Sequence, residues 1–261
     1  MFLAIDVGNT HTVFGIYIHG ALEHVFRMET RAQATPDELL AFLSSLFASR
    51  GLPLEDVEGM GVACVVPTLL YSLSRLGRSL WGQDPFVVDH TVDAGLAIRL
   101  FRPEEVGADR IVNASEAFHR LGASILVDFG TATTFDVVSP EGEYLGGCIT
   151  PGITVSMEAL YQRASKLPRV HVTRPDHALG QSTVEAMQAG VYFGYASLVD
   201  GLVTRLQAET AFPCRVAATG GLAPLIARDS ETIEEVFPDL TLDGIHRIWK
   251  NNRPDGRMAT P

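Results

Sequence analysis

The first apolar run of the chain ends in an aspartate that is followed by small polar residues. Asp6 comes directly after Phe-Leu-Ala-Ile, and Gly8, Asn9, Thr10 and Thr12 follow it closely. Glycine lets backbone N–H groups approach an anion, and the amide and hydroxyl side chains add neutral donors. Mg²⁺ prefers one or two carboxylates together with phosphate oxygens, so Asp6 is placed to hold it through the water shell. These residue types predict a turn that binds nucleotide phosphates, with an ordinary glycine hairpin as the alternative.

The same pattern occurs a second time in the chain. At a constant offset of 122 residues, Asp6 is matched by Asp128, Gly8 by Gly130, Thr12 by Thr134, Val13 by Phe135, Ile16 by Val138 and Gly20 by Gly142. In each copy an apolar strand ends in Asp, a second strand follows the turn, and a further glycine turn leads to a third strand. The duplication favours two hairpins that hold the phosphates from opposite sides over an unrelated pair of turns.

The elements that would position the first hairpin alternate strands with helices. Thr35 is a suitable N-cap, Pro36 suits the first helical position, and Glu38 completes a capping box, so a helix begins there. The alternation indicates an α/β half with a mixed sheet. Strands are expected over residues 2–8, 12–18, 21–29, 61–66 and 86–88, with a second helix over 67–80.

A second chemically suggestive segment precedes the helix expected over 111–121. Gly107 permits an unusual turn, and Asp109 and Arg110 then lie at the helix N-terminus. Asp109 can be read as a plain N-cap. Alternatively, its carboxylate accepts the proton of a substrate hydroxyl while Arg110 binds an anionic group of the substrate.

The second half repeats the plan from Ile125. A long helix over 183–207 is apolar nearly all round, and Gly190 and Gly194 would let another helix approach it. We therefore expect core on one face and a subunit contact on the other. The turn 219–221 predicts a contact to the nucleotide base or sugar, or else a plain strand–helix turn, and a last helix begins near 239.

Composition limits the classes of function. The 261 residues are 46% hydrophobic and 20% charged, which is typical of a globular chain of about two domains. A net charge of −11 argues against nucleic acid as a partner. Lys166 and Lys250 are the only lysines, so phosphates must be met by backbone N–H groups, metal or arginine.

The cysteines and the apolar runs of the chain indicate the cellular compartment. Cys64, Cys148 and Cys214 lie far apart in apolar settings, as expected of buried thiols in a reducing compartment. Asp6 interrupts the N-terminal apolar run, which argues against a signal peptide, and no apolar run is long enough for a membrane span. We expect a cytoplasmic protein with no membrane partner.

Taken together, these motifs resemble type III pantothenate kinase. The resemblance runs in order from about residue 2 to 252 and rests on the two Asp-x-Gly hairpins, Gly107–Arg110, Asp128–Asp136, Gly146-Gly147 with Pro151-Gly152, and Thr219–Gly221. It implies an α/β chain with the duplicated actin-like (ribonuclease H-like) ATPase fold: two mixed-sheet domains with a cleft between them. The implied domains are residues 1–115 and 116–252, followed by a flexible tail over 253–261.

The resemblance also implies an activity and its cofactors. The family phosphorylates pantothenate with ATP, the first step toward coenzyme A, as a homodimer that needs Mg²⁺ and a monovalent cation, K⁺ or NH₄⁺. Asp109 would be the general base, Asp128 would hold the monovalent cation, and Asp6 would lie near Mg²⁺. ATP would be bound by Asp6, Val7, Gly8, Asn9, Thr10, His11, Thr12, Val13, Gly130 and Thr131, and pantothenate by Gly107, Ala108, Asp109, Arg110 and Thr183, the last across a dimer interface formed by helix 183–207.

One departure from the family pattern concerns the substrate. Where the family has Tyr-x-Asn-Pro, this chain has Leu100-Phe101-Arg102-Pro103, so the tyrosine hydroxyl that contacts pantothenate is missing. A kinase for another small hydroxy acid is therefore an alternative. A regulatory homologue without catalysis is a second, although such a protein would have no need of Asp6, Asp109 and Asp128 together.

Overall fold

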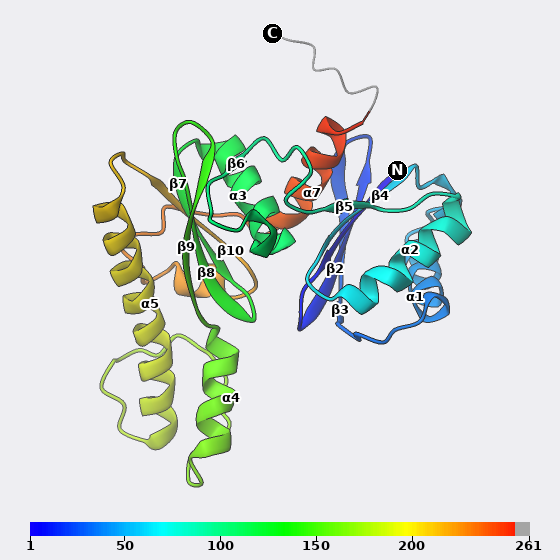
Figure 1. Ribbon diagram of the computed structural model, residues 1–261. Coiled ribbons are helices and arrows are strands. Elements are labelled where there is room, and N and C mark those ends of the chain that lie inside the picture. Colours follow the sequence, from blue (N-terminus) through cyan, green and yellow to red (C-terminus); the bar gives the residue numbers. More distant parts are fainter. Residues whose placement is uncertain (254–261) are drawn as a thin grey trace. The chain divides into compact units, whose positions relative to one another are not determined.

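The computed structural model describes residues 1–253, which form two compact units (Figure 1). The first unit contains Met1–Gly95, Arg102–Glu116 and the chain from Thr241, and the second contains Leu96–Phe101 and Ala117–Leu240. The last helix thus belongs with the first strands of the chain. Of the predicted tail, residues 254–261 lie outside the described part.

The first unit is built on a five-stranded mixed sheet. Its strand order is β3-β2-β1-β4-β5, with β1 antiparallel to β2 and parallel to β4. The bounds are β1 (Phe2–Val7), β2 (His11–Ile18), β3 (Ala21–Glu29), β4 (Gly59–Cys64) and β5 (Phe86–Val88). The predicted strands are therefore confirmed to within a few residues.

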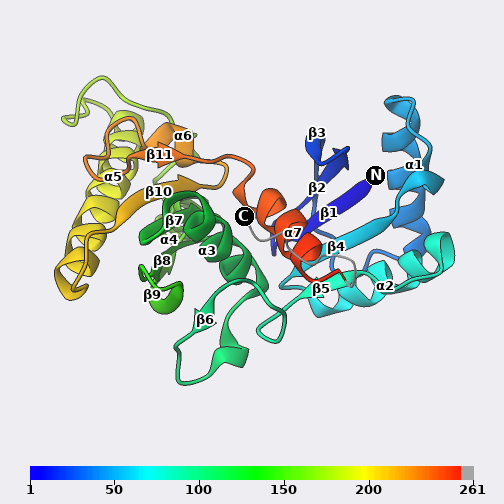
Figure 2. The ribbon, with the colours of Figure 1, turned by 90° about the horizontal axis from the view of Figure 1, so that it is seen from above.

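Two helices, α1 (Pro36–Ser49) and α2 (Pro67–Trp81), cover one face of this sheet and share a buried apolar core with it (Figure 2). The capping box at the start of α1 is confirmed: Glu38 N–H donates to the Thr35 hydroxyl at 3.3 Å, and Thr35 N–H donates to the Glu38 carboxylate at 2.8 Å. A short 3₁₀ turn, η1 (Leu54–Asp56), precedes β4.

The opposite face of the first sheet is covered by α7 (Leu240–Asn251). Glycines in β4 make room for it, because a Cβ at Gly59 would lie 2.6 Å from the Trp249 ring and one at Gly61 2.8 Å from Ile245. Arg247 of α7 also donates to the Glu116 carboxylate at 2.7 Å. The helix is thus an integral layer of the first unit.

The second unit repeats the strand order of the first. Its sheet runs β11-β10-β7-β8-β9-β6, which is the first arrangement with β6 added at the edge. The bounds are β6 (Ala97–Ile98), β7 (Ser124–Phe129), β8 (Ala132–Val138), β9 (Glu143–Pro151), β10 (Arg215–Thr219) and β11 (Glu235–Val236). The duplication inferred from the two Asp-x-Gly copies is confirmed by this topology.

Helices again cover the faces. Residues of α4 (Ile153–Arg163), α5 (Thr183–Glu209) and α6 (Ala223–Ile226) share one core with the second sheet. α3 (Ala108–Leu121) follows the short turn η2 (Pro103–Glu105), and its C-terminal part packs on the other face through Ala117 and Leu121. α4 was not predicted, and α3 begins at Ala108 instead of the predicted Ile111.

The constant offset between the two copies does not hold beyond the turn. Asp6 lies opposite Val13 in the first hairpin, whereas Asp128 lies opposite Thr134 in the second. The second turn is therefore one residue shorter. Thr134 takes the place of Val13, and Thr133 that of Thr12. The predicted matches of Thr12 with Thr134, Val13 with Phe135 and Ile16 with Val138 are therefore each wrong by one residue.

The cysteine prediction holds only in part, since Cys214 is buried whereas Cys64 and Cys148 are half-buried. Among residues 1–253, no helix combines the length and hydropathy needed to cross a membrane.

Candidate functional site

The first Asp-x-Gly turn presents three exposed residues. Gly8 N–H donates to the His11 carbonyl at 3.0 Å and closes the hairpin between β1 and β2. Asn9, Thr10 and His11 are exposed at its tip. In contrast, Val7 and Thr12 are each 1% exposed, so their side chains belong to the core and only their backbone can contribute to binding. The tip is therefore the part of the turn that a ligand can reach.

Thr30, which was not predicted as a site residue, holds this turn by hydrogen bonds to its carbonyl groups. Thr30, directly after β3, donates its backbone N–H to the Thr10 carbonyl at 2.9 Å. Its hydroxyl donates to the Gly8 carbonyl at 2.7 Å and lies 2.9 Å from the Thr12 hydroxyl. No local motif marks Thr30, because its partners are backbone atoms about twenty residues earlier in the chain.

Asp6 lies at the carboxyl end of β1, where the parallel neighbour β4 also ends. Val65 N–H donates to the Val7 carbonyl at 3.0 Å, so the hydrogen bonding between β1 and β4 continues one residue beyond the end of β4. Burial raises the pKa of the Cys64 thiol, and the negative charge of Asp6 raises it further. The thiol is therefore neutral at pH 7 and donates to the Val66 carbonyl at 3.2 Å.

The segment that contains Asp109 begins at this same edge of the first unit. Gly107 accepts a hydrogen bond from Ile111 N–H at 3.1 Å, so Gly107 caps α3 and Asp109 lies in the first helical turn. The N-cap interpretation of Asp109 is therefore wrong. A Cβ at Gly107 would lie 3.8 Å from Val65 and would collide with the Asp109 carboxylate, which explains the glycine. Asp109 Oδ1 accepts Arg110 N–H at 2.8 Å.

Within the first unit, Asp6 and the turn 8–12 therefore lie at the carboxyl end of β1, and Gly107, two residues before Asp109, lies near Val65 at the end of the parallel neighbour β4. In such sheets, ligands bind outside the carboxyl ends of the strands. Asp109 is half-buried, and it lies at a helix N-terminus, where the helix dipole stabilises a carboxylate. The arrangement places an exposed turn at the same strand ends as the segment that carries the Asp109 carboxylate.

The second turn has the same design with different residues. Gly130 N–H donates to the Ala132 carbonyl at 3.1 Å, and Gly130 and Thr131 are exposed. Gly152, directly after β9, donates its N–H to the Thr131 carbonyl at 3.1 Å, as Thr30 does to Thr10. A Cβ at Gly152 would lie 2.6 Å from the Gly130 carbonyl oxygen, so the shorter turn leaves room only for glycine there.

Asp128 lies beside the turn that follows β10. A Cβ at Gly220 would be 2.7 Å from Asp128 Oδ1 and also 2.7 Å from the Phe129 carbonyl oxygen, so two oxygens converge next to this glycine. Gly220 has a φ of 92°, which also favours glycine. The Thr219 hydroxyl donates to the Phe237 carbonyl at 2.7 Å. The turn after β10 thus packs directly against the Asp128 carboxylate.

Thr183 and Arg110 complete the predicted substrate residues. Thr183 is the exposed first residue of α5, whose N-cap Ser182 accepts Glu185 N–H at 3.2 Å. Arg110 is half-buried beside Asp109, while Ala108 is 8% exposed. The first unit therefore brings together Asp6, the first turn and Gly107–Arg110, whereas the second unit holds Asp128, Gly130, Thr131 and Thr183.

Within residues 1–253, no group of three or more His, Cys, Asp or Glu side chains is arranged to hold a metal ion.

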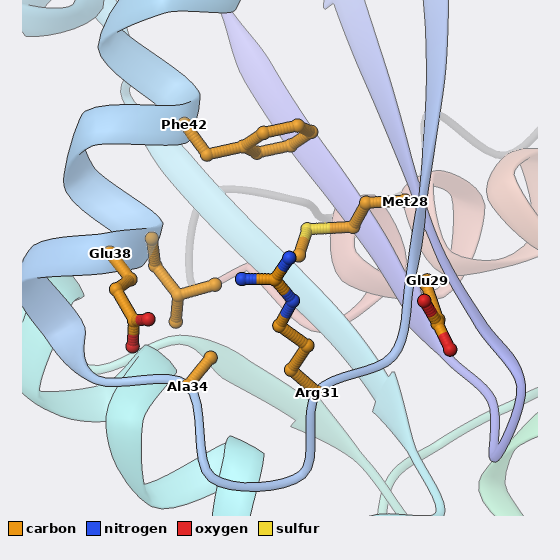
Figure 3. Close-up of a pocket in the computed structure, with 7 residues that line it drawn as sticks. Met28, Glu29, Arg31, Ala34, Glu38 and Phe42 are labelled. Atoms are coloured by element: carbon orange, nitrogen blue, oxygen red, sulfur yellow. The ribbon is translucent and has the colours of Figure 1, made fainter.

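A separate pocket of about 250 Å³ lies between the end of β3 and the start of α1 (Figure 3). It is lined by Met28, Glu29, Arg31, Ala34, Glu38, Leu39 and Phe42, with the Arg31 side chain directed into it. None of the predicted site residues lines this pocket.

Comparison with known proteins identifies close relatives. Residues 2–205 match the family model described as type III pantothenate kinase. The chain is 49% identical to a type III pantothenate kinase of Myxococcus xanthus over 97% of this chain and 99% of that one.

Solved structures with low sequence identity share the fold. The activator of 2-hydroxyisocaproyl-CoA dehydratase from Clostridium difficile, with bound ADPNP, is 13% identical with a TM-score of 0.55 and covers 95% of this chain and 93% of that one. A ROK family glucokinase from Streptomyces griseus, in complex with glucose and AMPPNP, is 12% identical with a TM-score of 0.53 and covers 95% and 98%. The expected actin-like ATPase fold is thereby confirmed.

Proposed function

The chain belongs to the type III pantothenate kinase family, and we propose that it transfers the γ-phosphoryl group of ATP to pantothenate with Asp109 as general base. The supporting observation is the position of Asp109, in the first turn of α3 and beside the end of β4. In this step Asp109 takes the proton of the primary hydroxyl, the oxygen bonds to the γ-phosphorus, and the bond to the ADP oxygen breaks.

The backbone of the first turn binds the phosphates. Asn9, Thr10 and His11 are exposed at its tip, while Gly8 and Val13 flank it and the buried Val7 and Thr12 hold it in the sheet. Gly130 and Thr131, exposed on the second turn, also contact ATP. Phosphoryl transfer depends mostly on positioning and on charge neutralisation, so backbone donors and a few carboxylates are sufficient.

The proposal includes two cation sites, which the oxygen atoms present support. Asp6, at the end of β1, holds Mg²⁺ through its water shell. Asp128 and the Phe129 carbonyl, which converge beside Gly220, suit a monovalent cation such as K⁺ or NH₄⁺. When bound, these cations neutralise the charge that develops on the phosphates.

Pantothenate is held near Asp109 by Gly107, Ala108 and Arg110, whose guanidinium suits the pantothenate carboxylate. Leu100 replaces the tyrosine of the family pattern, and its side chain packs against Gly146, 3.0 Å from the position of a Cβ there. A side chain without a hydroxyl at this position cannot donate to the substrate, so binding relies more on the other groups.

A homodimer forms through α5, with Thr183 reaching the partner's pantothenate. One side of α5 is buried, whereas Gly190 and Gly194 are exposed with open space around them. Exposed apolar side chains on the neighbouring α4, among them Val155 (44%) and Leu160 (42%), extend the surface. Small residues beside apolar ones are suited to close helix packing. The enzyme works in the cytoplasm, where its three thiols stay reduced.

The test is turnover by the purified protein with ATP, Mg²⁺ and K⁺. Pantothenate and a panel of small hydroxy acids are offered separately, and ADP release is measured. Phosphorylation of pantothenate in preference to the other acids supports the proposal. Preference for a different acid supports the alternative kinase, and nucleotide binding without turnover of any acid supports a regulatory homologue.

A further inference from the structure

The two Asp-x-Gly turns differ at the residue that supports them. Thr30 and Gly152 occupy the same place, each directly after the third strand of its meander, and each donates its N–H to a carbonyl of the turn. Only the first turn carries the extra residue, and only there does a side chain fill the space behind the turn. The hydroxyl of Thr30 therefore makes a side-chain hydrogen bond to the longer first turn, and Gly152 has no counterpart of this bond in the shorter second turn.

The hydrogen bonds of Thr30 have one consistent direction. Its hydroxyl carries a single hydrogen, and that hydrogen goes to the Gly8 carbonyl at 2.7 Å. In the 2.9 Å contact between Thr12 and Thr30, the donor is therefore Thr12. Thr12 is 1% exposed, so this chain of hydroxyls is fixed in place by the core.

These bonds set the orientation of two peptide groups. Thr30 draws the carbonyls of Gly8 and Thr10 toward itself through its hydroxyl and its N–H. No cis peptide occurs within residues 1–253, and in a trans peptide the N–H points opposite to the carbonyl. The N–H groups of Asn9 and His11 consequently point away from Thr30, and both residues belong to the exposed tip of the turn.

We propose that Thr30 is a positioning residue that holds the Asn9 and His11 N–H groups toward the phosphates of ATP. This rests on the proposed function only in taking ATP as the ligand of the turn. Without the hydroxyl, the Gly8–Asn9 peptide loses the bond that fixes it, so the donors are no longer preorganised before the nucleotide arrives.

The test compares Thr30→Val with Thr30→Ser. Valine keeps the shape and the backbone N–H but removes the hydroxyl, whereas serine keeps the hydroxyl. Thr68→Val is the matched control, because the Thr68 hydroxyl donates to the Ala32 carbonyl at 2.6 Å in the neighbouring loop, away from the turn. Calorimetry with Mg²⁺ measures the Kd of AMPPNP and, separately, of adenosine, which has no phosphate.

Thr30→Val should weaken AMPPNP binding about tenfold, as expected for one lost hydrogen bond to a preorganised group, and leave adenosine binding unchanged. Thr30→Ser and Thr68→Val should bind both ligands within about twofold of the wild type. If Thr30→Val binds AMPPNP with the affinity of the wild type, the proposal is overturned, whether or not the protein phosphorylates pantothenate. Weaker adenosine binding in Thr30→Val also overturns it, because the role of Thr30 is then structural.

Discussion

The hydroxyl of Tyr17 donates a hydrogen bond of 2.6 Å to the carboxylate of Asp243, 226 residues further along the chain. The same ring stacks on His246 with 4.0 Å between the ring centroids. A strand of the first hairpin is thereby joined to the last helix, on the face of the sheet opposite α1 and α2. This contact belongs to the layer that supports β1 and the turn after it.

Replacing Tyr17 by Phe should lower the free energy of unfolding by about 2 kcal/mol, because a buried bond to a charged acceptor is lost. Denaturant unfolding, followed by circular dichroism, measures the change. Tyr71→Phe, at a side chain that is 65% exposed, is the control and should change stability by less than about 0.5 kcal/mol. Equal stability of the two variants would contradict this role of Tyr17.

His246 should make stability fall in mild acid. Burial and, to a smaller extent, the positive charge of Lys250 lower its pKa to about 4, while the negative charge of Asp243 opposes the shift. Because the ordinary pKa is about 6.5, the unfolded chain takes up a proton between these values that the folded chain does not. The stability due to neutral His246 is therefore complete above pH 6.5 and is lost as the pH falls toward 4.

Unfolding free energies at pH 7.5 and pH 5.0 test this expectation. The wild type should lose about 2 kcal/mol more than His246→Phe over this interval. His90→Phe, at an exposed position, should keep the wild-type pH dependence. The expectation fails if His246→Phe has the same pH dependence as the wild type.

Asp109→Asn should reduce kcat by about 10²- to 10⁴-fold, because the amide cannot accept the hydroxyl proton. The Kd of AMPPNP should stay unchanged. Asp37→Asn is a matched control, since Asp37 is the second residue of α1 as Asp109 is the second of α3. Retention of full turnover by Asp109→Asn would exclude it as the general base.

Gly220→Ala should raise the K⁺ concentration for half-maximal activity by about tenfold or more, because the new methyl group displaces the Asp128 carboxylate. The measurement is initial rate against K⁺ at saturating ATP. Gly122→Ala controls for backbone strain alone, since Gly122 also has positive φ, 73°, but open space around it. A shift of equal size in both variants would point to strain as the cause.

Gly194→Glu should convert the proposed dimer to a monomer, because a charged side chain cannot be buried between closely packed helices. Light scattering after gel filtration gives the mass. Ala41→Glu, on an exposed position of α1, should leave the dimer intact. A wild-type protein that is monomeric at micromolar concentration would rule out the α5 interface.

Patterns local in the sequence predicted the fold well. The capping box at Thr35 and Glu38 involves residues three apart, so its residue types suffice to locate the start of α1. The strands of both meanders were predicted from apolar runs and the glycine turns between them. The starts of α3 and α4 lack such a signal: Gly107 caps α3 with its backbone carbonyl, and Gly152, the N-cap of α4, makes no side-chain cap bond.

Features that depend on tertiary contacts were not predictable. The second turn is one residue shorter than the first, but the Asp and Gly of the motif keep their spacing. That Thr134 corresponds to Val13 can therefore be seen only in the strand pairing. Thr30 acts on carbonyls distant in the chain, and backbone carbonyls carry no sequence signature. The position of Asp109 beside the end of β4 likewise depends on the packing of Gly107 on Val65.

The helix that covers Gly59 and Gly61 has a consequence for synthesis of the protein. The ribosome makes β1, β2 and β4 first and α7 only after the whole second unit. Until then, the aromatic surface of Phe2 and Tyr17 has no cover, which is the kind of exposed apolar face that chaperones bind. The first unit, which carries the first Asp-x-Gly turn, is therefore begun first and completed last.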